Sequence, residues 1–261
     1  MTQLPEKIAA LVAGKEYVTD SIGMSGAGIL LYPDMALKIT PDNEAARQEA
    51  GVMAWLRGRL PVPEILACER ENGRQFLLMT RLPGAMLCDK SVISDARNVA
   101  RLLAEALEML RGLDTAGCPY LADLDTELAI AREHVERGEV DVENTEPDTF
   151  APGGFRDPAH LLKWLEENRP AEELRFTHGD MCLPNIFTEN GRVSGFLDLG
   201  GAGLGDPYRD YALAYRSLRH NTDGSFGHTA PSFDPDVLFK HLGITPDRDK
   251  LRYYTLLDEL F

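Results

Sequence analysis

The sequence has few cysteines and no long apolar run, and both shortages exclude classes of protein. Its four cysteines lie far apart and form no Cys-x-x-Cys pair, so neither a zinc site nor a disulfide framework is indicated. The N-terminus lacks a basic segment followed by an apolar stretch, and no later segment is apolar enough to cross a bilayer. We therefore expect a cytoplasmic protein without an export signal or a membrane partner.

Positive charge is also scarce. The chain carries 27 Lys and Arg against 42 Asp and Glu, a formal net charge of -15. This balance argues against a nucleic-acid partner, because a phosphate backbone is bound by clustered Lys and Arg. Residues 121–150 hold ten Asp and Glu against two Arg. A solvated helical surface would account for that segment, and a cationic ligand would account for it if a binding site were indicated independently.

The chain changes character near Pro83-Gly84. The part before this point has short β-type runs and one helix, which Asn43 can cap, and the part after it is helical with one β-hairpin. We predict an α+β protein with a small β-rich lobe over residues 1–83 and a larger, mostly helical lobe over residues 84–261, which includes an acidic insert over about 121–175. Strands are predicted over 17–21, 28–32, 35–40, 65–68, 75–80, 185–188 and 193–197, and helices over 43–57, 95–113, 157–167 and from about 210 to the end.

The segment with the clearest chemistry runs from Phe176 to Asn185. Asp180 and Asn185 have the Asp-x-x-x-x-Asn spacing of a protein-kinase catalytic loop, and Asp198-Leu199-Gly200 stands where such enzymes place Asp-Phe-Gly. Phosphoryl transfer needs an acid to orient the attacking hydroxyl and oxygen ligands to hold Mg²⁺ on the phosphates. We therefore predict Asp180 as the catalytic acid group and Asn185 and Asp198 as metal ligands. Taken singly, each could be a helix cap, a turn residue or a loop acid.

A kinase needs partners for this loop in its first lobe. Lys38, on a predicted strand, is the candidate for the phosphate-pairing lysine, and Glu49, on the helix that follows, is the candidate to hold it. The turn between the first two strands includes Ser25 and Gly26 and can present backbone N-H groups to phosphates, although by itself it is a hairpin turn. Asp210 precedes a helical run, so we expect it to cap that helix, with bracing of the catalytic loop as a compatible second role.

With these motifs in place, the chain resembles an aminoglycoside 3'-phosphotransferase, a family within the eukaryotic-like kinase superfamily. The resemblance covers nearly the whole length. Beyond the catalytic loop, it rests on the stretches 55–63, 76–80 and 256–261. It implies a bilobal, protein-kinase-like fold with ATP between the lobes, adenine bonded to the backbone around Thr80 and Leu82, and two Mg²⁺ ions on Asn185 and Asp198.

The resemblance also implies a cationic aminoglycoside as the substrate, phosphorylated at its 3'-hydroxyl, which would confer resistance. Its ammonium groups would lie against acids of the helical lobe and the C-terminal tail, which gives the acidic segment a partner. The implied substrate residues are Glu143, Glu146, Asp258, Glu259 and the carboxylate of Phe261.

Four departures from the family pattern fall near ligands. Ala36 stands where relatives often place an aromatic ring over adenine, so GTP is an alternative nucleotide. Gly201 stands where Arg commonly follows the Asp-x-Gly. His220-Asn221 replaces an expected acidic pair, and residues 222–235 form a longer stretch than usual.

Two other functions remain open at this stage. The first is a kinase of another small amino-alcohol or sugar metabolite, and the tail and the acidic insert argue against it. The second is a pseudokinase that binds nucleotide without catalysis, and the presence of Lys38, Asp180, Asn185 and Asp198 together argues against that. The sequence indicates no oligomeric state.

Overall fold

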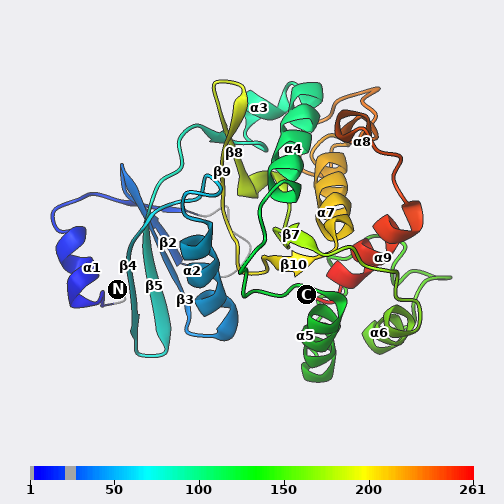
Figure 1. The fold of residues 1–261 in the computed structure, drawn as a ribbon, viewed down its shortest axis with the longest axis horizontal. Coiled ribbons are helices and arrows are strands. Elements are labelled where there is room, and N and C mark those ends of the chain that lie inside the picture. Colours follow the sequence, from blue (N-terminus) through cyan, green and yellow to red (C-terminus); the bar gives the residue numbers. More distant parts are fainter. Residues whose placement is uncertain (1–2, 21–27) are drawn as a thin grey trace.

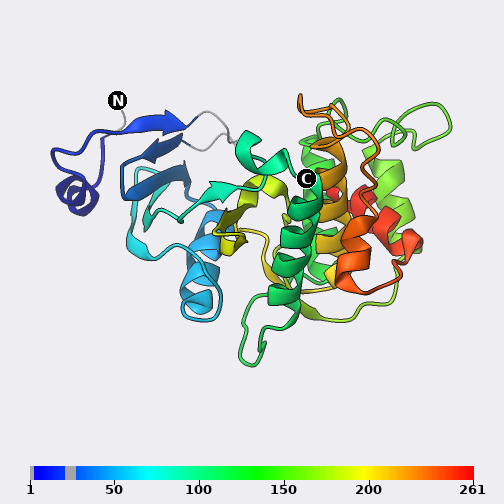
Figure 2. The same ribbon diagram turned by 90° about the horizontal axis from the view of Figure 1, so that it is seen from above.

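A computed structural model of the protein describes residues 3–20 and 28–261. A β-rich N-terminal region lies beside a larger helical region, and the turned view keeps the two side by side (Figure 1, Figure 2). This arrangement confirms the predicted α+β class with a β-rich first part and a helical second part. Within the described ranges, no helix is both long and apolar enough to cross a membrane.

The N-terminal region is built on one antiparallel sheet with the strand order β1-β2-β3-β5-β4. The turn between β4 and β5 places Asn72 and Gly73 at φ angles of 52° and 72°, a backbone that Asn and Gly adopt at low cost. Strand β4 runs three residues beyond its predicted end, because its pairing with β5 continues down to this tight turn. The strands are β1 Val18–Asp20, β2 Gly28–Leu31, β3 Met35–Pro41, β4 Ile65–Glu71 and β5 Arg74–Thr80.

The two faces of this sheet have different neighbours because side chains alternate along each strand. Leu37, Phe76 and Leu78 join Ile8 of helix α1 (Glu6–Leu11) in a small core. The opposite face carries Ala36, Lys38, Leu77 and Met79 toward helix α2 (Glu44–Leu56). Asn43 caps α2 as predicted, accepting the N-H of Ala46. Helix α1 was not expected, since its six residues show too little periodicity.

Helix α4 forms the centre of the larger region. Its Val99, Ala100, Leu102 and Leu103 are fully buried in the main core, as expected for a helix that packs on several sides. The predicted helices over 95–113 and 157–167 correspond to α4 and α6, and the helix predicted from about 210 begins three residues earlier. The helices of this region are α3 Lys90–Ile93, α4 Ala96–Arg111, α5 Leu124–Arg137, α6 Pro158–Glu167, α7 Pro207–His220, α8 Val237–Leu242 and α9 Arg248–Asp258.

Two small sheets hold the loops between these helices. Strand β6 (Ala85–Met86) pairs with β8 (Ile186–Glu189), which pairs with β9 (Arg192–Phe196), and β7 (Arg175–Thr177) pairs with β10 (Gly203–Gly205). The hairpin of β8 and β9 was predicted. Strands β6, β7 and β10 were not predicted, because strands of two or three residues are too short to show an alternation of apolar and polar residues. Since the first sheet ends at Thr80 and β6 joins the second region, the lobe boundary near residue 83 stays a reasonable prediction.

Candidate active site

The predicted catalytic loop begins directly after β7, at His178. Gly179 has a φ angle of 85°, and a Cβ atom there would lie 2.2 Å from the carbonyl oxygen of Gly201. Only glycine allows this backbone and this close approach. The loop then passes Asp180 and closes in a 3-10 turn over Leu183–Asn185, which leads into β8.

Asp210 holds the backbone of the catalytic loop by hydrogen bonds. Its buried carboxylate accepts the N-H groups of His178 and Gly179 at 2.8 and 3.0 Å. Burial raises the pKa of Asp210, and these contacts oppose the rise. The expectation that Asp210 caps helix α7 is wrong, because Asp206 is the N-cap and accepts the N-H of Tyr208. Asp210 lies in the first turn, where its side chain points at the loop.

Asp180 and Asn185 meet across the loop. The Nδ2 of Asn185 donates to the carboxylate Oδ2 of Asp180 at 2.8 Å and to its carbonyl oxygen at 2.9 Å. Two bonds from one amide fix both the backbone and the carboxylate, so Asp180 is held in one direction. In this orientation, the Oδ1 of Asn185 points away from these two bonds and is its remaining acceptor atom.

Lys38 joins the two regions of the chain. Its buried Nζ donates to Glu49 on α2 and to Asp198 beyond β9, both at 2.8 Å. Burial acts to lower the pKa of Lys38, but the carboxylates of Glu49 and Asp198 outweigh it and the pKa is raised. Lys38 is therefore a buried cation whose contact with Asp198 can be exchanged for a phosphate oxygen. Asp198 has a φ angle of 58°, which Asp adopts more readily than most residues.

The residues predicted to hold Mg²⁺ offer suitable donors. Mg²⁺ prefers oxygen ligands and often takes one or two from the protein with the rest from phosphates and water. The Oδ1 of Asn185 and the carboxylate of Asp198 are such oxygens. In the described part of the chain, no group of three or more His, Cys, Asp or Glu side chains could hold an ion alone. These donors fit a Mg²⁺ ion that binds together with the nucleotide, whose phosphates supply further ligands.

The predicted nucleotide contacts lie around β3 and β5. Ala36 is buried and pairs with Met79, two residues before Lys38 on the same face. Thr80 ends β5, and its hydroxyl accepts the N-H of Glu64. Leu82 follows, and its side chain packs so closely on Gly195 of β9 that a Cβ there would lie 2.4 Å from it. Ser25 and Gly26 lie outside the described residues.

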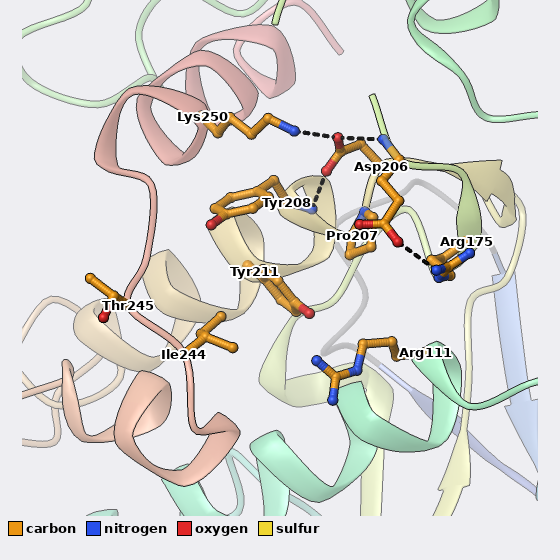
Figure 3. A pocket seen from close by; sticks show the side chains of 10 residues that line it. Arg111, Arg175, Asp206, Pro207, Tyr208, Tyr211, Ile244, Thr245 and Lys250 are labelled. Carbon is orange, nitrogen blue, oxygen red and sulfur yellow. Dashed lines mark hydrogen bonds and ion pairs between the residues drawn. The ribbon is translucent and has the colours of Figure 1, made fainter. Parts of the chain in front are cut away.

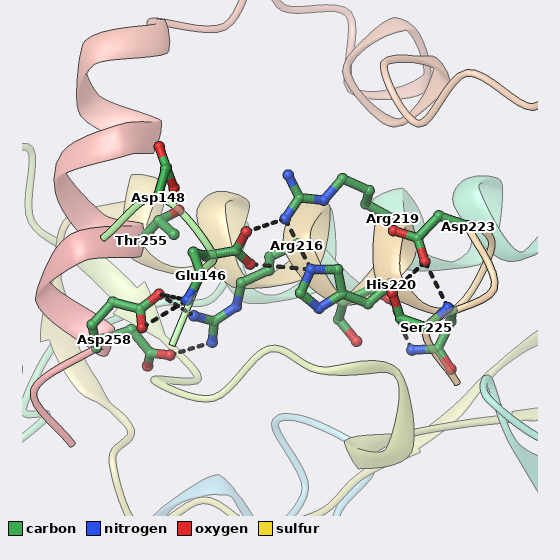
Figure 4. A network of polar contacts seen from close by, with 12 residues as sticks. Glu146, Asp148, Arg216, Arg219, His220, Asp223, Ser225, Thr255 and Asp258 are labelled. Atoms are coloured by element: carbon green, nitrogen blue, oxygen red, sulfur yellow. Dashed lines mark hydrogen bonds and ion pairs between the residues drawn. The ribbon is translucent and has the colours of Figure 1, made fainter. Parts of the chain in front are cut away.

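Three of the predicted substrate acids come together at the end of the chain (Figure 4). The carboxylates of Glu146, Asp258 and Glu259 gather around Arg216 and Arg219, and we call these five residues the tail cluster. Arg216 pairs with Asp258 and lies 3.6 Å from Glu259, and Arg219 pairs with Glu146. The N-H of Glu146 donates to both carboxylate oxygens of Glu259 at 3.1 Å.

The tail cluster is continuous with the catalytic loop. Ser217, beside Arg216 on α7, accepts the N-H of Leu183 at 3.0 Å. Cys182 belongs to this loop, and burial raises the pKa of its thiol, with Asp180 and Asp258 adding to the rise. Sequence reasoning missed Arg216 and Ser217. Two arginines one helical turn apart, at 216 and 219, are the only signal that could have pointed to them.

The other two predicted substrate residues lie apart from the cluster's contacts. Glu143 is exposed, and its backbone N-H donates to Asp141. Phe261 is 41% exposed, and its ring meets His134 of α5 edge to face at 5.4 Å. His134 also contacts the carbonyl oxygen of Leu260 at 3.1 Å, so the C-terminus is docked on α5 (Figure 1).

A cavity of about 590 Å³ lies elsewhere, between α4, α7 and α9 (Figure 3). None of the predicted site residues lines it. Each of its cations already has a carboxylate partner: Arg111 pairs with Glu108, Arg175 with Glu173, and Lys250 with Asp206. Nothing in this cavity therefore marks it as the active site.

Fold and site together define a kinase-like phosphotransferase, with a buried lysine held by a helix glutamate and an Asp-x-x-x-x-Asn loop opposite it. Residues 27–252 match the model of the phosphotransferase enzyme family known as APH, and the chain belongs to this family.

Individual relatives agree with this membership. The chain is 35% identical to an aminoglycoside 3'-phosphotransferase of Enterococcus faecalis and 34% identical to one of Staphylococcus aureus, each over 99% of this chain and 98% of the relative. Among solved structures, it matches an aminoglycoside 3'-phosphotransferase of type VIII with a TM-score of 0.85, at 26% identity over 98% of this chain and 97% of that one. It also shares its fold with APH(3'')-Id of Streptomyces rimosus, solved with ADP and streptomycin, with a TM-score of 0.80 at 24% identity over 97% and 95% of the two chains.

Proposed function

We propose that this protein transfers the γ-phosphoryl group of ATP, bound with Mg²⁺, to the 3'-hydroxyl of an aminoglycoside. The observation that supports this most strongly is that the buried pair Lys38 and Glu49 reaches Asp198 by a 2.8 Å bond from Lys38, with Asp180 held by Asn185 across the loop. Names of relatives over nearly the full length supply the substrate class.

In this proposal, the nucleotide lies between the two regions, with adenine near the backbone of Thr80 and Leu82. Lys38 exchanges Asp198 for phosphate oxygens, and Glu49 keeps the ammonium aimed at them. Asn185 and Asp198 would hold Mg²⁺, which would supply positive charge to the phosphates.

Asp180 accepts a hydrogen bond from the substrate hydroxyl and directs it at the γ-phosphorus. As the O-P bond to the substrate forms and the bond to the β-phosphate oxygen breaks, Asp180 takes the hydroxyl proton. Asn185 and Asp210 contribute by positioning, since one fixes the carboxylate and the other fixes the loop backbone.

The aminoglycoside amines are proposed to lie against the tail cluster, with Glu143 and the Phe261 carboxylate as outer contacts. A kinase of another amino-alcohol is the alternative, since any cationic alcohol could approach the same acids. The full-length match to aminoglycoside enzymes disfavours it.

Steady-state ADP release tests the proposal. We expect Mg²⁺-dependent ADP release with kanamycin and only background release with choline, in matched assays that contain ATP. Equal or faster release with choline would favour the metabolite kinase. No release with any of a panel of aminoglycosides would reject the proposal.

A further inference from the structure

One buried carboxylate oxygen of the tail cluster lacks a donor. Glu146 is 9% exposed, and its Oε2 accepts from the guanidinium of Arg219. Its Oε1 has no hydrogen-bond partner within the described part of the chain. A buried acceptor left unpaired is costly, so it is a natural place for an incoming N-H group.

A ring nitrogen of His220 lies beside this oxygen. The His220 Nε2 lies 3.1 Å from the Oε1 of Glu146 and 2.9 Å from the same Arg219 nitrogen that contacts the Oε2 (Figure 4). Arginine nitrogens only donate, so a neutral His220 ring accepts from Arg219 at Nε2 and carries its proton on Nδ1. The Oε1 then faces a lone pair rather than a donor, which accounts for its lack of a hydrogen bond.

These contacts assign a role to residues outside the proposed substrate set. We propose that Arg219 and His220 determine substrate specificity, because Arg219 occupies one oxygen of Glu146, His220 stands against the other, and a substrate ammonium binds by displacing them. The inference rests on the proposed function. Arg219 is 41% exposed, so its side chain can swing into solvent when a ligand replaces it.

The displacement sets which ligands bind well. The ammonium group of a ligand must replace the guanidinium of Arg219 as the hydrogen-bond donor to the Oε2 of Glu146. In return, the ligand can also donate to the unpaired Oε1. A compound with several ammonium groups can engage Glu146 and the remaining acids together, whereas a single ammonium only exchanges one cation for another. The cluster thus disfavours small monocations.

Acid should oppose binding through His220. Burial lowers the pKa of His220, and Glu146 opposes this shift while Arg219 adds to it. Once protonated at Nε2, the ring donates to Oε1 and competes with the ligand. The charged groups that face His220 are Arg216 and Arg219 of α7, Glu146 of the loop before α6, and Asp223 of the loop after α7. Phe226 packs edge to face on the ring at 6.0 Å.

The test compares two arginine variants by calorimetry with kanamycin and ADP, a non-reacting pair. Arg219→Gln removes the displaced cation. Arg132→Gln is the control, since Arg132 is a half-exposed arginine that pairs with Glu166 and is not a member of the tail cluster. Both variants make the protein more negative by one charge. We expect Arg219→Gln to bind kanamycin about two- to five-fold more tightly than Arg132→Gln. Equal or weaker binding by Arg219→Gln overturns the inference.

A second arm follows pH. Wild-type affinity for kanamycin should weaken between pH 7.5 and about 5.5, and His220→Phe should lose part of that dependence. An unchanged profile in His220→Phe removes His220 from the role. If the wild-type protein binds no aminoglycoside and releases no ADP with any of them, the proposed function itself fails, and this outcome is separate from equal affinities in the two variants.

Discussion

The molecule has two partly buried charge clusters that can be compared. On the nucleotide side, one cation, Lys38, lies between two carboxylates, and the catalytic loop stands opposite with its own internal bonds. In the tail cluster, three carboxylates are shared between two arginines. By formal count, each cluster keeps one negative charge in excess. In the first, both carboxylates share a single cation beside Asn185, where a metal can use the excess charge. In the second, every carboxylate already lies within ion-pair distance of an arginine before any ligand arrives.

The comparison shows that the net charge of the chain does not predict the electrostatic environment at a particular site. The formal charge of -15 and the acidic segment 121–150 were compatible with a solvated surface or with a site that attracts cations. Glu146 belongs to that segment, yet an arginine from α7 already pairs with it. Attraction of a polycation then depends on exchange between cations, which is weaker and more selective than attraction to free carboxylates.

The largest expected effect is on the nucleotide side. Asp198→Ala should abolish Mg²⁺-dependent ATP binding, because it removes a proposed metal ligand. Calorimetry with ATP in the presence and absence of Mg²⁺ measures this. Asp125→Ala, which removes an exposed surface carboxylate, should bind like the wild type. Unchanged affinity in Asp198→Ala would contradict the metal assignment.

Asp180→Ala should act on turnover alone. We expect kcat to fall at least ~100-fold with ATP and kanamycin affinities nearly unchanged, because the carboxylate acts as the hydroxyl attacks phosphorus. Steady-state ADP release and calorimetry give the two quantities. Turnover close to the wild-type value would remove Asp180 from its role.

In the tail cluster, the two arginines should differ in stability effects. Arg216 is 22% exposed and faces two carboxylates, so Arg216→Gln should reduce the free energy of unfolding by about 1 to 3 kcal/mol. Arg219 is more exposed, so Arg219→Gln should reduce the free energy of unfolding by less. Urea unfolding of both variants measures the ranking, and an equal or reversed order would show that Arg216 is not the structural member of the pair.

The smallest expected effect concerns pH. Burial raises the pKa of Glu259 from 4.5 to about 7. The folded protein therefore binds more protons than the unfolded chain between these values, and the contribution of Glu259 to stability decreases as pH rises through this window. Glu259→Gln should flatten that part of the profile of unfolding free energy against pH. A profile as steep as that of the wild type would show that Glu259 is already ionised in the folded protein at pH 5.

The parts that sequence reasoning predicted are those fixed by local spacing. The strands predicted over 65–68 and 75–80 flank Asn72-Gly73, which forms a tight turn between them. Asp180 and Asn185 are five residues apart in one loop, so their meeting follows from the loop itself. Lys38 and Glu49 were paired through the fold that the loop implied.

The parts that were missed depend on packing between distant elements. Arg216 meets Asp258 across 42 residues, and Arg219 meets Glu146 across 73. Nothing in the spacing of these residues shows that the arginines turn toward the acids. The cap expected at Asp210 was wrong, because Asp206 takes that place. The second expected role of Asp210, bracing the catalytic loop, is confirmed by its bonds to the N-H groups 31 and 32 residues earlier.

The central claim is that one carboxylate directs one hydroxyl of an aminoglycoside at ATP. Parallel reactions with kanamycin and with tobramycin, which lacks the 3'-hydroxyl, test it most directly when ADP is quantified and the phosphorylated position is assigned by NMR. We predict that kanamycin is phosphorylated at its 3'-oxygen and that tobramycin binds without reacting. Rapid phosphorylation of tobramycin would contradict the account, because the reacting hydroxyl would then be a different one.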